Sequence, residues 1–219
     1  MSEPSITHSK IAGLILAGGQ SRRMQGQDKG LQMLNGQMLV AHVIARLRPQ
    51  LGQVWLCANR HLSQYETFDL PVFSDETAYL GMGPLAGIAS FTAHLPDEYT
   101  HVQIAPCDTP FLPADLSARL YAAACAHDAL AVYPQTTEGA HYSCALLHRS
   151  LLASAASHLH HDLNNRQGQR SLHGWLAQHR ALAVAGFDEA DFANINTSEQ
   201  LQSHTEYTKH TDFFGVNHA

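Results

Sequence analysis

Short apolar runs that alternate with stretches of helical spacing constrain the fold of this chain more than any other feature. The runs are rich in β-forming residues and cover residues 11–16, 54–57, 72–73, 102–105 and 129–133. Between them lie stretches with apolar residues three or four positions apart, of which 39–47, closed by Pro49, and 116–124, entered through Pro113, are the clearest. This alternation predicts an α/β fold, a doubly wound and mostly parallel sheet with helices on both faces.

The second half of the chain carries a weaker pattern of the same kind. We predict strands over residues 143–147 and 181–185, and helices over residues 151–161, over residues 171–179 and from near Thr197. No internal repeat or low-complexity linker divides the chain, and 219 residues suit one domain. We therefore expect a flexible N-terminus over residues 1–10, a single domain over residues 11–209 and a loose tail over residues 210–219.

Composition excludes several classes of protein. Lys and Arg number 13 against 19 Asp and Glu, for a net charge of −6, so no basic face for nucleic acid is expected. Residues 1–10 hold no apolar signal core, and residues 11–16 are too few to span a bilayer, so we expect no membrane segment. The four cysteines form no C-x-x-C pair. We expect a cytoplasmic protein with reduced thiols.

A glycine-rich, basic stretch directly follows the first apolar run. It has the sequence Leu-Ala-Gly-Gly-Gln-Ser-Arg-Arg-Met-Gln-Gly-Gln-Asp-Lys and ends at Lys29. Gly18 and Gly19 let the backbone approach a ligand where a Cβ would prevent it. Ser21, Arg22 and Lys29 add a hydroxyl and cationic groups, which together with backbone N–H donors can bind a polyphosphate. Open α/β sheets bind ligands at this edge, so the stretch predicts a phosphate site.

Two familiar phosphate-binding motifs do not match the stretch. A Walker loop needs Gly, Lys and Ser or Thr in succession, whereas two residues separate Gly26 from Lys29. The dinucleotide fingerprint G-x-G-x-x-G fails because Gly18 and Gly19 are adjacent. Taken alone, a Gly-Gly pair is also compatible with an ordinary turn that carries solvated charges.

Two carboxylates follow predicted strands at the same edge. Asp108 comes just after the run at 102–105, where a hard oxygen ligand can hold Mg²⁺ together with substrate phosphates. The alternative is a cap for the turn before Pro110. Asp75 follows the run at 72–73 and is a candidate to contact a nucleotide or to orient the loop.

The stretch ending at Lys29 resembles the signature of the nucleotidyltransferases that make the dinucleotide form of the molybdenum cofactor, in the pattern Leu-Ala-Gly-Gly-x-Ser-x-Arg-Met-x-Gly-x-Asp-Lys. The resemblance extends from about residue 11 to about residue 201. The further matching segments are, in order, Ala58-Asn59-Arg60, Asp75, Gly83-Pro84-Leu85-Ala86-Gly87-Ile88, Pro106-Cys107-Asp108-Thr109-Pro110 and Asn194-Ile195-Asn196-Thr197.

This resemblance implies a Rossmann-like nucleotidyltransferase fold and an enzyme that uses Mg²⁺. The implied reaction transfers GMP from GTP to the phosphate of molybdopterin carrying molybdenum and releases pyrophosphate. Guanine is favoured because the related cytidylyltransferases carry Ala-Ala-Gly in the loop and lack the Gly-Pro-Leu-Ala-Gly segment. Other proteins of cofactor synthesis and the apo-molybdoenzymes are implied as further partners. The alternatives are a cytidylyl or sugar-1-phosphate nucleotidyltransferase of the same fold and a non-catalytic GTP-binding protein that delivers the cofactor.

The resemblance also assigns roles to residues. The implied catalytic residues are Arg22, Lys29 and Asp108, and the implied metal ligands are Asp108 and Asn196. Independently of the resemblance, Arg166 and Arg170 are candidates for the acceptor side, because a phosphate monoester needs cationic partners, and the alternative is that they are solvated surface arginines. Asn194 is a further candidate there through its amide oxygen, and the alternative is that it forms a turn. The implied nucleotide-binding residues are Leu16, Ala17, Gly18, Gly19, Ser21, Lys29, Cys57, Asn59, Asp75, Gly83, Pro84, Leu85 and Asp108.

Several positions depart from the family pattern or suggest other chemistry. The departures are Gln25 for a glycine, Cys57 for an asparagine, Ser198 for a proline and His141-Tyr142 for His-Pro. Cys107 lacks the partners of a nucleophile, so we interpret it as a small buried residue. The nearby histidines do not have the i, i+4 spacing of a helical zinc site: His158, His160 and His161.

Overall fold

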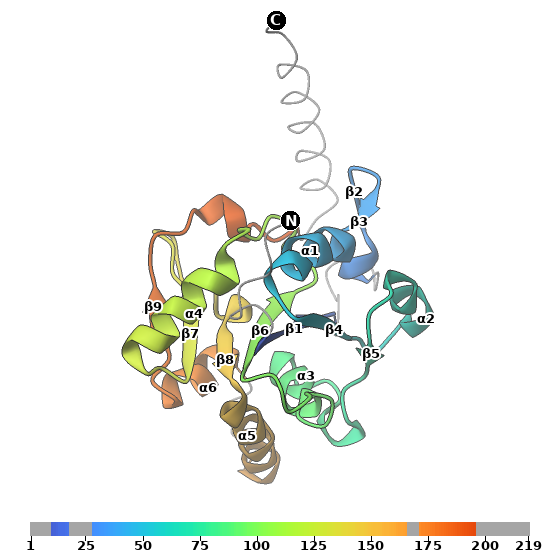
Figure 1. Cartoon of the computed structure of the whole chain (residues 1–219). Coiled ribbons are helices and arrows are strands. Elements are labelled where there is room, and N and C mark those ends of the chain that lie inside the picture. The colour runs from blue at the N-terminus through green and yellow to red at the C-terminus, as the bar shows by residue number, and fades with distance from the viewer. Residues whose placement is uncertain (1–9, 18–27, 166–170, 196–219) are drawn as a thin grey trace, which may run out of the picture.

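A seven-stranded sheet forms the centre of the computed structural model, which describes residues 10–17, 28–165 and 171–195 (Figure 1). The strand order is β5-β4-β1-β6-β8-β7-β9. The strands are β1 (Ile11–Leu16), β4 (Gln53–Cys57), β5 (Val72–Phe73), β6 (His101–Pro106), β7 (Ala131–Pro134), β8 (Leu146–His148) and β9 (Leu182–Val184). The predicted α/β class with a mostly parallel sheet is confirmed.

Strand directions place most carboxyl ends at one edge of the sheet. β1 pairs in parallel with β4 and β6, and β4 with β5. β8 runs antiparallel to both β6 and β7, so β7 and its parallel partner β9 run in the direction of β6. The strand expected over residues 143–147 is observed as β8, which is shorter and begins later, at Leu146. It begins later because Tyr142–Cys144 form a 3-10 turn, in which the Cys144 N–H donates to the His141 carbonyl at 3.0 Å.

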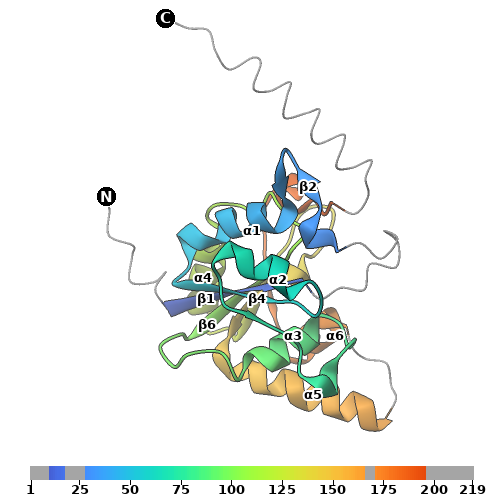
Figure 2. The same ribbon diagram turned by 90° about the vertical axis from the view of Figure 1, so that its right-hand side faces the viewer.

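Helices cover both faces of the sheet, as Figure 2 shows. One face carries α1 and α4, and the other carries α3, α5 and α6. The helices are α1 (Leu39–Leu47), α2 (Leu62–Tyr65), α3 (Pro84–Phe91), α4 (Leu116–His127), α5 (Leu152–Asn165) and α6 (Leu172–Gln178). The central strand β1 is buried on both faces, with Ile11 and Ile15 packed toward α1 and Leu14 toward α3. A strand buried on both faces has the continuous apolar run seen in the sequence.

A two-stranded hairpin lies outside the main sheet and was not among the predicted elements. β2 (Met33–Leu34) pairs antiparallel with β3 (Gln37–Met38). Asn35 and Gly36 between them have φ of 51° and 80°. Asn-Gly favours this two-residue turn because both residues tolerate positive φ, so the signal was present in the sequence.

Several predictions fall on other parts of the chain. The helix expected from near Thr197, the loose tail and all of the expected flexible N-terminus except Lys10 lie outside the described residues. The cysteines are present as free thiols, at Cys57, Cys107, Cys125 and Cys144. Within the described ranges, no helix has both the length and the apolar character needed to span a membrane.

His101 at the start of β6 couples the fold to pH. Its ring lies 5.1 Å from the His148 ring and 5.0 Å from the Tyr121 ring. Burial, assisted by the charge of His148, lowers the pKa of His101 to about 4. An unfolded histidine titrates near 6.5, so between these values the unfolded chain binds more protons than the folded chain. Stability from this group is therefore present above about pH 6.5 and is lost as the pH falls toward 4.

We expect His101→Gln to make the free energy of unfolding less dependent on pH below about pH 7. In urea unfolding at pH values between about 4.5 and 7, the unmodified protein loses free energy of unfolding as the pH falls. The variant loses less, because it lacks the group that takes up a proton on unfolding. His127→Gln, at the exposed end of α4, is the matched control and keeps the unmodified slope. Equal slopes for the His101 variant and the control would contradict this expectation.

Candidate functional site

A cavity of about 250 Å³ opens at the carboxyl ends of β1, β4 and β6. This is the edge at which the sequence predicts a ligand site, and the strand directions explain why residues distant in sequence meet there. Its walls come from the ends of these strands, the segment before α3 and the segment after β6. The lining residues are Leu16, Ala17, Asp28, Lys29, Cys57, Asp75, Gly81, Gly83, Pro84, Gly87, Pro106, Cys107, Asp108 and Ser143.

Lys29 and Asp108 form an ion pair in the cavity wall. Lys29 Nζ donates to Asp108 Oδ2 at 3.1 Å, although 79 positions separate the two residues. The Asp108 side chain is 12% exposed and the Lys29 side chain 30%, so the ammonium group remains closer to solvent. The pair brings together the cation and the carboxylate that the sequence assigned to phosphate and metal.

Asp28 fixes the turn of backbone that carries Lys29. Asp28 Oδ1 accepts a hydrogen bond from the Tyr65 hydroxyl at 2.6 Å and from the Gly30 N–H at 3.2 Å, which caps the short turn Lys29–Leu31. Tyr65 is completely buried, and burial raises the pKa of its phenol, so the phenol keeps its proton and remains the donor. A Cβ on Gly30 would lie 2.6 Å from the Tyr65 oxygen, so this close approach requires glycine.

Asp75 is held by two side chains at the β4 side of the cavity. The Cys57 thiol donates to Asp75 Oδ1 at 3.2 Å, and Asn59 Nδ2 donates to Oδ2 at 2.6 Å. The Asp75 N–H donates in return to Asn59 Oδ1 at 2.9 Å. The carboxylate is thus fixed in orientation, and each oxygen retains further lone pairs.

The first turn of α3 lies directly against the cavity. Pro84 occupies its first position, after Gly83 with φ of 80°. A Cβ added at Gly87 would lie 2.6 Å from a terminal methyl of Leu16 and 3.2 Å from the sulfur of Cys57. Glycine at position 87 therefore keeps open the space between α3 and the ends of β1 and β4.

Most of the predicted nucleotide-binding residues that the structure describes lie together around the cavity. Those lining the cavity are Leu16, Ala17, Lys29, Cys57, Asp75, Gly83, Pro84 and Asp108. Asn59 contributes indirectly, through Asp75. Leu85 is fully buried in the core on the α3 face and does not line the cavity. Gly18, Gly19, Ser21 and Arg22 lie outside the described residues, directly after the lining residue Ala17.

The predicted acceptor residues are only partly described. Asn194 Oδ1 accepts a hydrogen bond from the Thr109 hydroxyl at 2.7 Å, and the Ile195 N–H donates to the Asp108 carbonyl at 3.0 Å. These contacts place Asn194 next to the segment that carries Asp108. Arg166, Arg170 and Asn196 lie outside the described residues.

The cysteines near the cavity are poor nucleophiles. Burial raises the pKa of the Cys57 and Cys107 thiols well above the usual range, and raises that of Cys144 to about 12. The negative charge of Asp75 adds to the effect at Cys57, and that of Asp108 adds to it at Cys107. Because the thiolate is the reactive form, these side chains act as small buried groups at neutral pH.

The Asp108 carboxylate has the chemistry of a ligand for a divalent cation. Its carboxylate faces the cavity and already has a cationic group, Lys29 Nζ, at 3.1 Å. In the part of the chain that the structure describes, no three His, Cys, Asp or Glu side chains gather closely enough to hold a metal by themselves. A single carboxylate of this kind holds a divalent cation when water or a bound molecule supplies the remaining oxygen ligands.

Several residues of the site were missing from the sequence prediction, among them Asp28, Gly87, Tyr65 and Ser143. Asp28 stood in the quoted motif beside Lys29, so its position was a usable signal. Gly87 lay in the matching Gly-Pro-Leu-Ala-Gly segment, which was predicted only as the start of a helix with small residues. Tyr65 and Ser143 carried no signal, because their contacts with the site depend on tertiary packing.

Comparisons with known proteins agree with this geometry. The family model for the MobA-like NTP transferase domain matches residues 13–182. A molybdenum cofactor guanylyltransferase of Shewanella sp. (strain MR-4) is 40% identical over 195 residues, which are 88% of this chain and 94% of the relative.

Solved structures share the fold at low sequence identity. Molybdopterin-guanine dinucleotide biosynthesis protein A from Archaeoglobus fulgidus has a TM-score of 0.69 at 23% identity, covering 91% of this chain and 99% of that one. A Mycobacterium tuberculosis protein in complex with manganese has a TM-score of 0.62 at 18% identity, covering 90% and 98%. From its sheet order, its cavity and these matches, the chain belongs to the MobA-like NTP transferase family.

Proposed function

We propose that the protein transfers GMP from GTP to the terminal phosphate of molybdopterin carrying molybdenum, with release of pyrophosphate. The Lys29–Asp108 pair in the cavity wall is the observation that carries the proposal. A lysine suited to phosphates and a carboxylate suited to a divalent cation meet at the edge where α/β sheets bind nucleotides. The relatives named guanylyltransferases supply the choice of base and acceptor.

The chemistry needs positioning and charge neutralisation more than a nucleophilic side chain. An oxygen of the acceptor phosphate attacks the α-phosphorus of GTP. The new P–O bond forms as the bond from that phosphorus to the α–β bridging oxygen breaks, and this oxygen leaves with pyrophosphate. The attacking phosphate is already anionic, so no covalent enzyme intermediate and no general base are required.

Lys29 stabilises the leaving pyrophosphate, together with Arg22 and the backbone N–H groups of Gly18 and Gly19. Negative charge builds on the bridging oxygen during the transfer, so a cation placed there acts most strongly in the transition state. Asp28 and Tyr65 hold the backbone that carries Lys29. The proposal thus gives Lys29 a role in both nucleotide binding and rate.

Asp108 would hold Mg²⁺, with Asn196 as a second ligand. The metal would neutralise charge on the phosphates and orient them. The manganese complex of the Mycobacterium tuberculosis protein supports a divalent cation in this family of folds. The contact of Asp108 with the Lys29 ammonium at 3.1 Å keeps this carboxylate beside the lysine that we propose for the phosphates.

Asp75 is the residue that we propose for contact with the base. Guanine offers an N1–H and an exocyclic amine side by side, and a carboxylate accepts from both. Cys57 and Asn59 fix the orientation of this carboxylate. Cytosine and adenine lack this pair of adjacent donors, which favours GTP over CTP and ATP.

Two alternatives remain distinguishable by experiment. A cytidylyl or sugar-1-phosphate nucleotidyltransferase of the same fold would use another nucleotide or acceptor. A non-catalytic GTP-binding protein that delivers the cofactor would have no need for a metal carboxylate such as Asp108. Other proteins of cofactor synthesis and the apo-molybdoenzymes are proposed as partners that receive or supply the cofactor.

We expect pyrophosphate release with GTP to exceed that with CTP or ATP by about 10⁴, because the wrong base leaves polar groups of the site without hydrogen-bond partners. The measurement is steady-state pyrophosphate release with molybdopterin and Mg²⁺, for each nucleotide in turn. Omission of molybdopterin is the control and should abolish release. Equal turnover of CTP would contradict the guanylyl assignment, and nucleotide binding without any pyrophosphate release would favour the delivery protein.

A further inference from the structure

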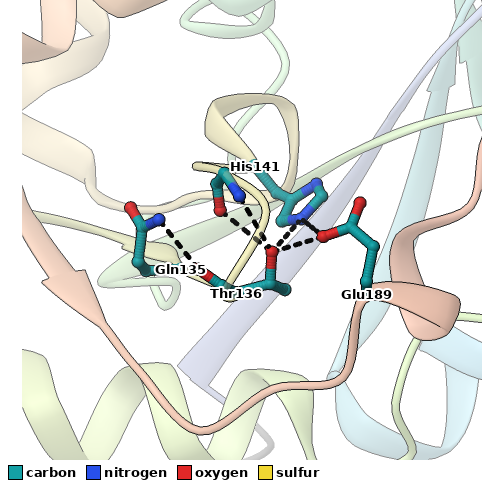
Figure 3. A network of polar contacts seen from close by, with 5 residues as sticks. Gln135, Thr136, His141 and Glu189 are labelled. Carbon is teal, nitrogen blue, oxygen red and sulfur yellow. Dashed lines mark hydrogen bonds and ion pairs between the residues drawn. The ribbon is translucent and has the colours of Figure 1, made fainter.

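A polar cluster outside the nucleotide half of the site joins β7 to the segment after β9. Figure 3 shows Thr136, His141 and Glu189, which we call the Thr-His-Glu cluster. The Thr136 hydroxyl donates to Glu189 Oε2, and His141 Nε2 lies 3.2 Å from that same oxygen and 3.2 Å from Thr136 Oγ1. Because a carboxylate only accepts hydrogen bonds, Nε2 is the donor toward Glu189.

The cluster is built into the fold. Thr136 is 7% exposed, and its Oγ1 also accepts the Gly139 N–H at 3.2 Å. The His141 ring stacks on Phe192 at 4.3 Å, and the His141 N–H donates to the Pro134 carbonyl at 2.9 Å.

Glu189 carries its charge in this cluster. The hydrogen bond from Thr136, followed by the charge and hydrogen bond of His141, lowers the pKa of Glu189 against the opposing effect of its burial. A charged carboxylate thus anchors His141 through a charge-assisted hydrogen bond.

The cluster lies at the same sheet edge as the cavity. Thr136 follows β7, and Glu189 lies in the turn after β9. Both strands run in the direction of β6, whose carboxyl end carries Asp108. The proposed catalytic edge therefore continues from β6 across β8 to this cluster.

His141 begins the segment that reaches the cavity. Two positions later Ser143 lines the cavity wall, and Cys144 is held by its carbonyl, which accepts from the buried Gln103 Nε2 at 2.9 Å. The cluster fixes one end of this segment and Gln103 fixes the other. Among the described lining residues, Ser143 is the one that follows Asp108 in the sequence.

The position of Ser143 indicates which substrate it faces. The proposed nucleotide contacts, such as Asp75 and Gly83, come from the β5-β4-β1 side of the cavity. Asp108 follows β6, in the middle of the sheet, and Ser143 comes from the β8 side. In an in-line transfer the attacking group approaches opposite the leaving group, so a substrate other than the nucleotide has the β8 side available.

We propose that the Thr-His-Glu cluster is a positioning device that sets the Ser143 hydroxyl as a contact for the acceptor phosphate. The inference rests on the proposed transferase function. It adds an acceptor wall, by which we mean the β8 side of the cavity where Ser143 would contact the acceptor phosphate. Ser143 touches the phosphate monoester, whereas Thr136, His141 and Glu189 act through the segment that carries it. A loosened segment lowers affinity for the acceptor and leaves the GTP contacts intact, since small displacements of positioning groups reduce productive binding.

Steady-state kinetics with GTP and molybdopterin varied separately test the proposal. Thr136→Val removes the hydroxyl at nearly constant shape, and Ser143→Ala removes the proposed contact. We expect both to raise the KM for molybdopterin about tenfold, the effect of losing about one hydrogen bond to a charged group. The KM for GTP stays within about twofold. Thr136→Ser keeps the hydroxyl and restores the unmodified KM.

Glu138→Gln is the matched control for Glu189→Gln, because Glu138 is an exposed acid in the same β7 loop outside the cluster. We expect the Glu189 variant to raise the KM for molybdopterin and the Glu138 variant to leave it unchanged. Circular dichroism and GTP binding follow the fold of each variant. Ser143→Ala provides a test that does not depend on the buried Thr136.

The outcomes separate this inference from the function on which it rests. If the unmodified protein makes no pyrophosphate from GTP and molybdopterin, the proposed function fails. If it does so and both Ser143→Ala and Thr136→Val keep the unmodified KM for molybdopterin, the acceptor wall is wrong. An equal rise in KM for both substrates would make the cluster a general structural clamp and would also overturn the inference.

Discussion

Asp108→Asn is expected to lower the rate of pyrophosphate release by at least about 10²–10³, the usual effect of removing one preorganised electrostatic contact. The substitution keeps the shape of the side chain and one acceptor oxygen, and removes the charge that would hold a divalent cation. The check is steady-state pyrophosphate release with GTP, molybdopterin and Mg²⁺, together with a Mg²⁺ titration.

Asp69→Asn is the matched control, since Asp69 is exposed, does not line the cavity and has φ of 54°, which asparagine also tolerates. Thermal unfolding should give nearly the same midpoint for both variants and the unmodified protein. An active Asp108→Asn variant with an unchanged Mg²⁺ requirement would show that Asp108 is not the metal ligand.

Lys29→Ala is expected to weaken GTP binding and to slow the transfer step by about 10²–10³. Binding weakens because a cationic phosphate contact is lost, and the step slows because the charge on the leaving group grows toward the transition state. The substitution also leaves the Asp108 carboxylate, 12% exposed, without its cationic neighbour, which lowers the free energy of unfolding modestly. Fluorescent GTP titration and single-turnover kinetics measure the two effects separately.

Lys10→Ala provides the comparison, because Lys10 is an exposed lysine just before β1, at the opposite end of that strand from the cavity. It should leave both GTP affinity and rate unchanged. If Lys29→Ala weakened GTP binding and kept the full rate of transfer, the lysine would serve in binding alone.

The fold was predictable where local pattern and tertiary environment agree. β1 is buried on both faces, so its apolar run is unbroken, and α1 ends where Pro49 follows. The direction of β8 was not predictable, because a short antiparallel strand inserted between β6 and β7 leaves no trace in its own sequence. The hairpin at Asn35-Gly36 had a clear turn signal that the alternating pattern obscured.

The sequence was enough to predict which types of residue form the candidate site and at which edge of the sheet they lie. It was not enough to predict the contacts between those residues. The glycine-rich stretch and Asp108 each follow a strand, and the ends of parallel strands meet at one edge, which brought Lys29 to Asp108. The support of Asp28 by Tyr65 joins residues 37 positions apart in a buried hydrogen bond. The link from Glu189 to His141 spans 48 positions. Such contacts are set by packing between elements and have no local sequence pattern.

The central claim is a direct transfer that depends on a metal held by Asp108 and proceeds without a covalent cysteine intermediate. Cys107, its neighbour in the cavity wall, is the nucleophile that a covalent mechanism would use, although burial keeps its pKa high and its thiol protonated. The most direct test is steady-state pyrophosphate release by Cys107→Ser and Asp108→Asn side by side, with circular dichroism as the folding control. The account predicts near-normal release by Cys107→Ser and almost none by Asp108→Asn, whereas an inactive, folded Cys107→Ser beside an active Asp108→Asn would contradict it.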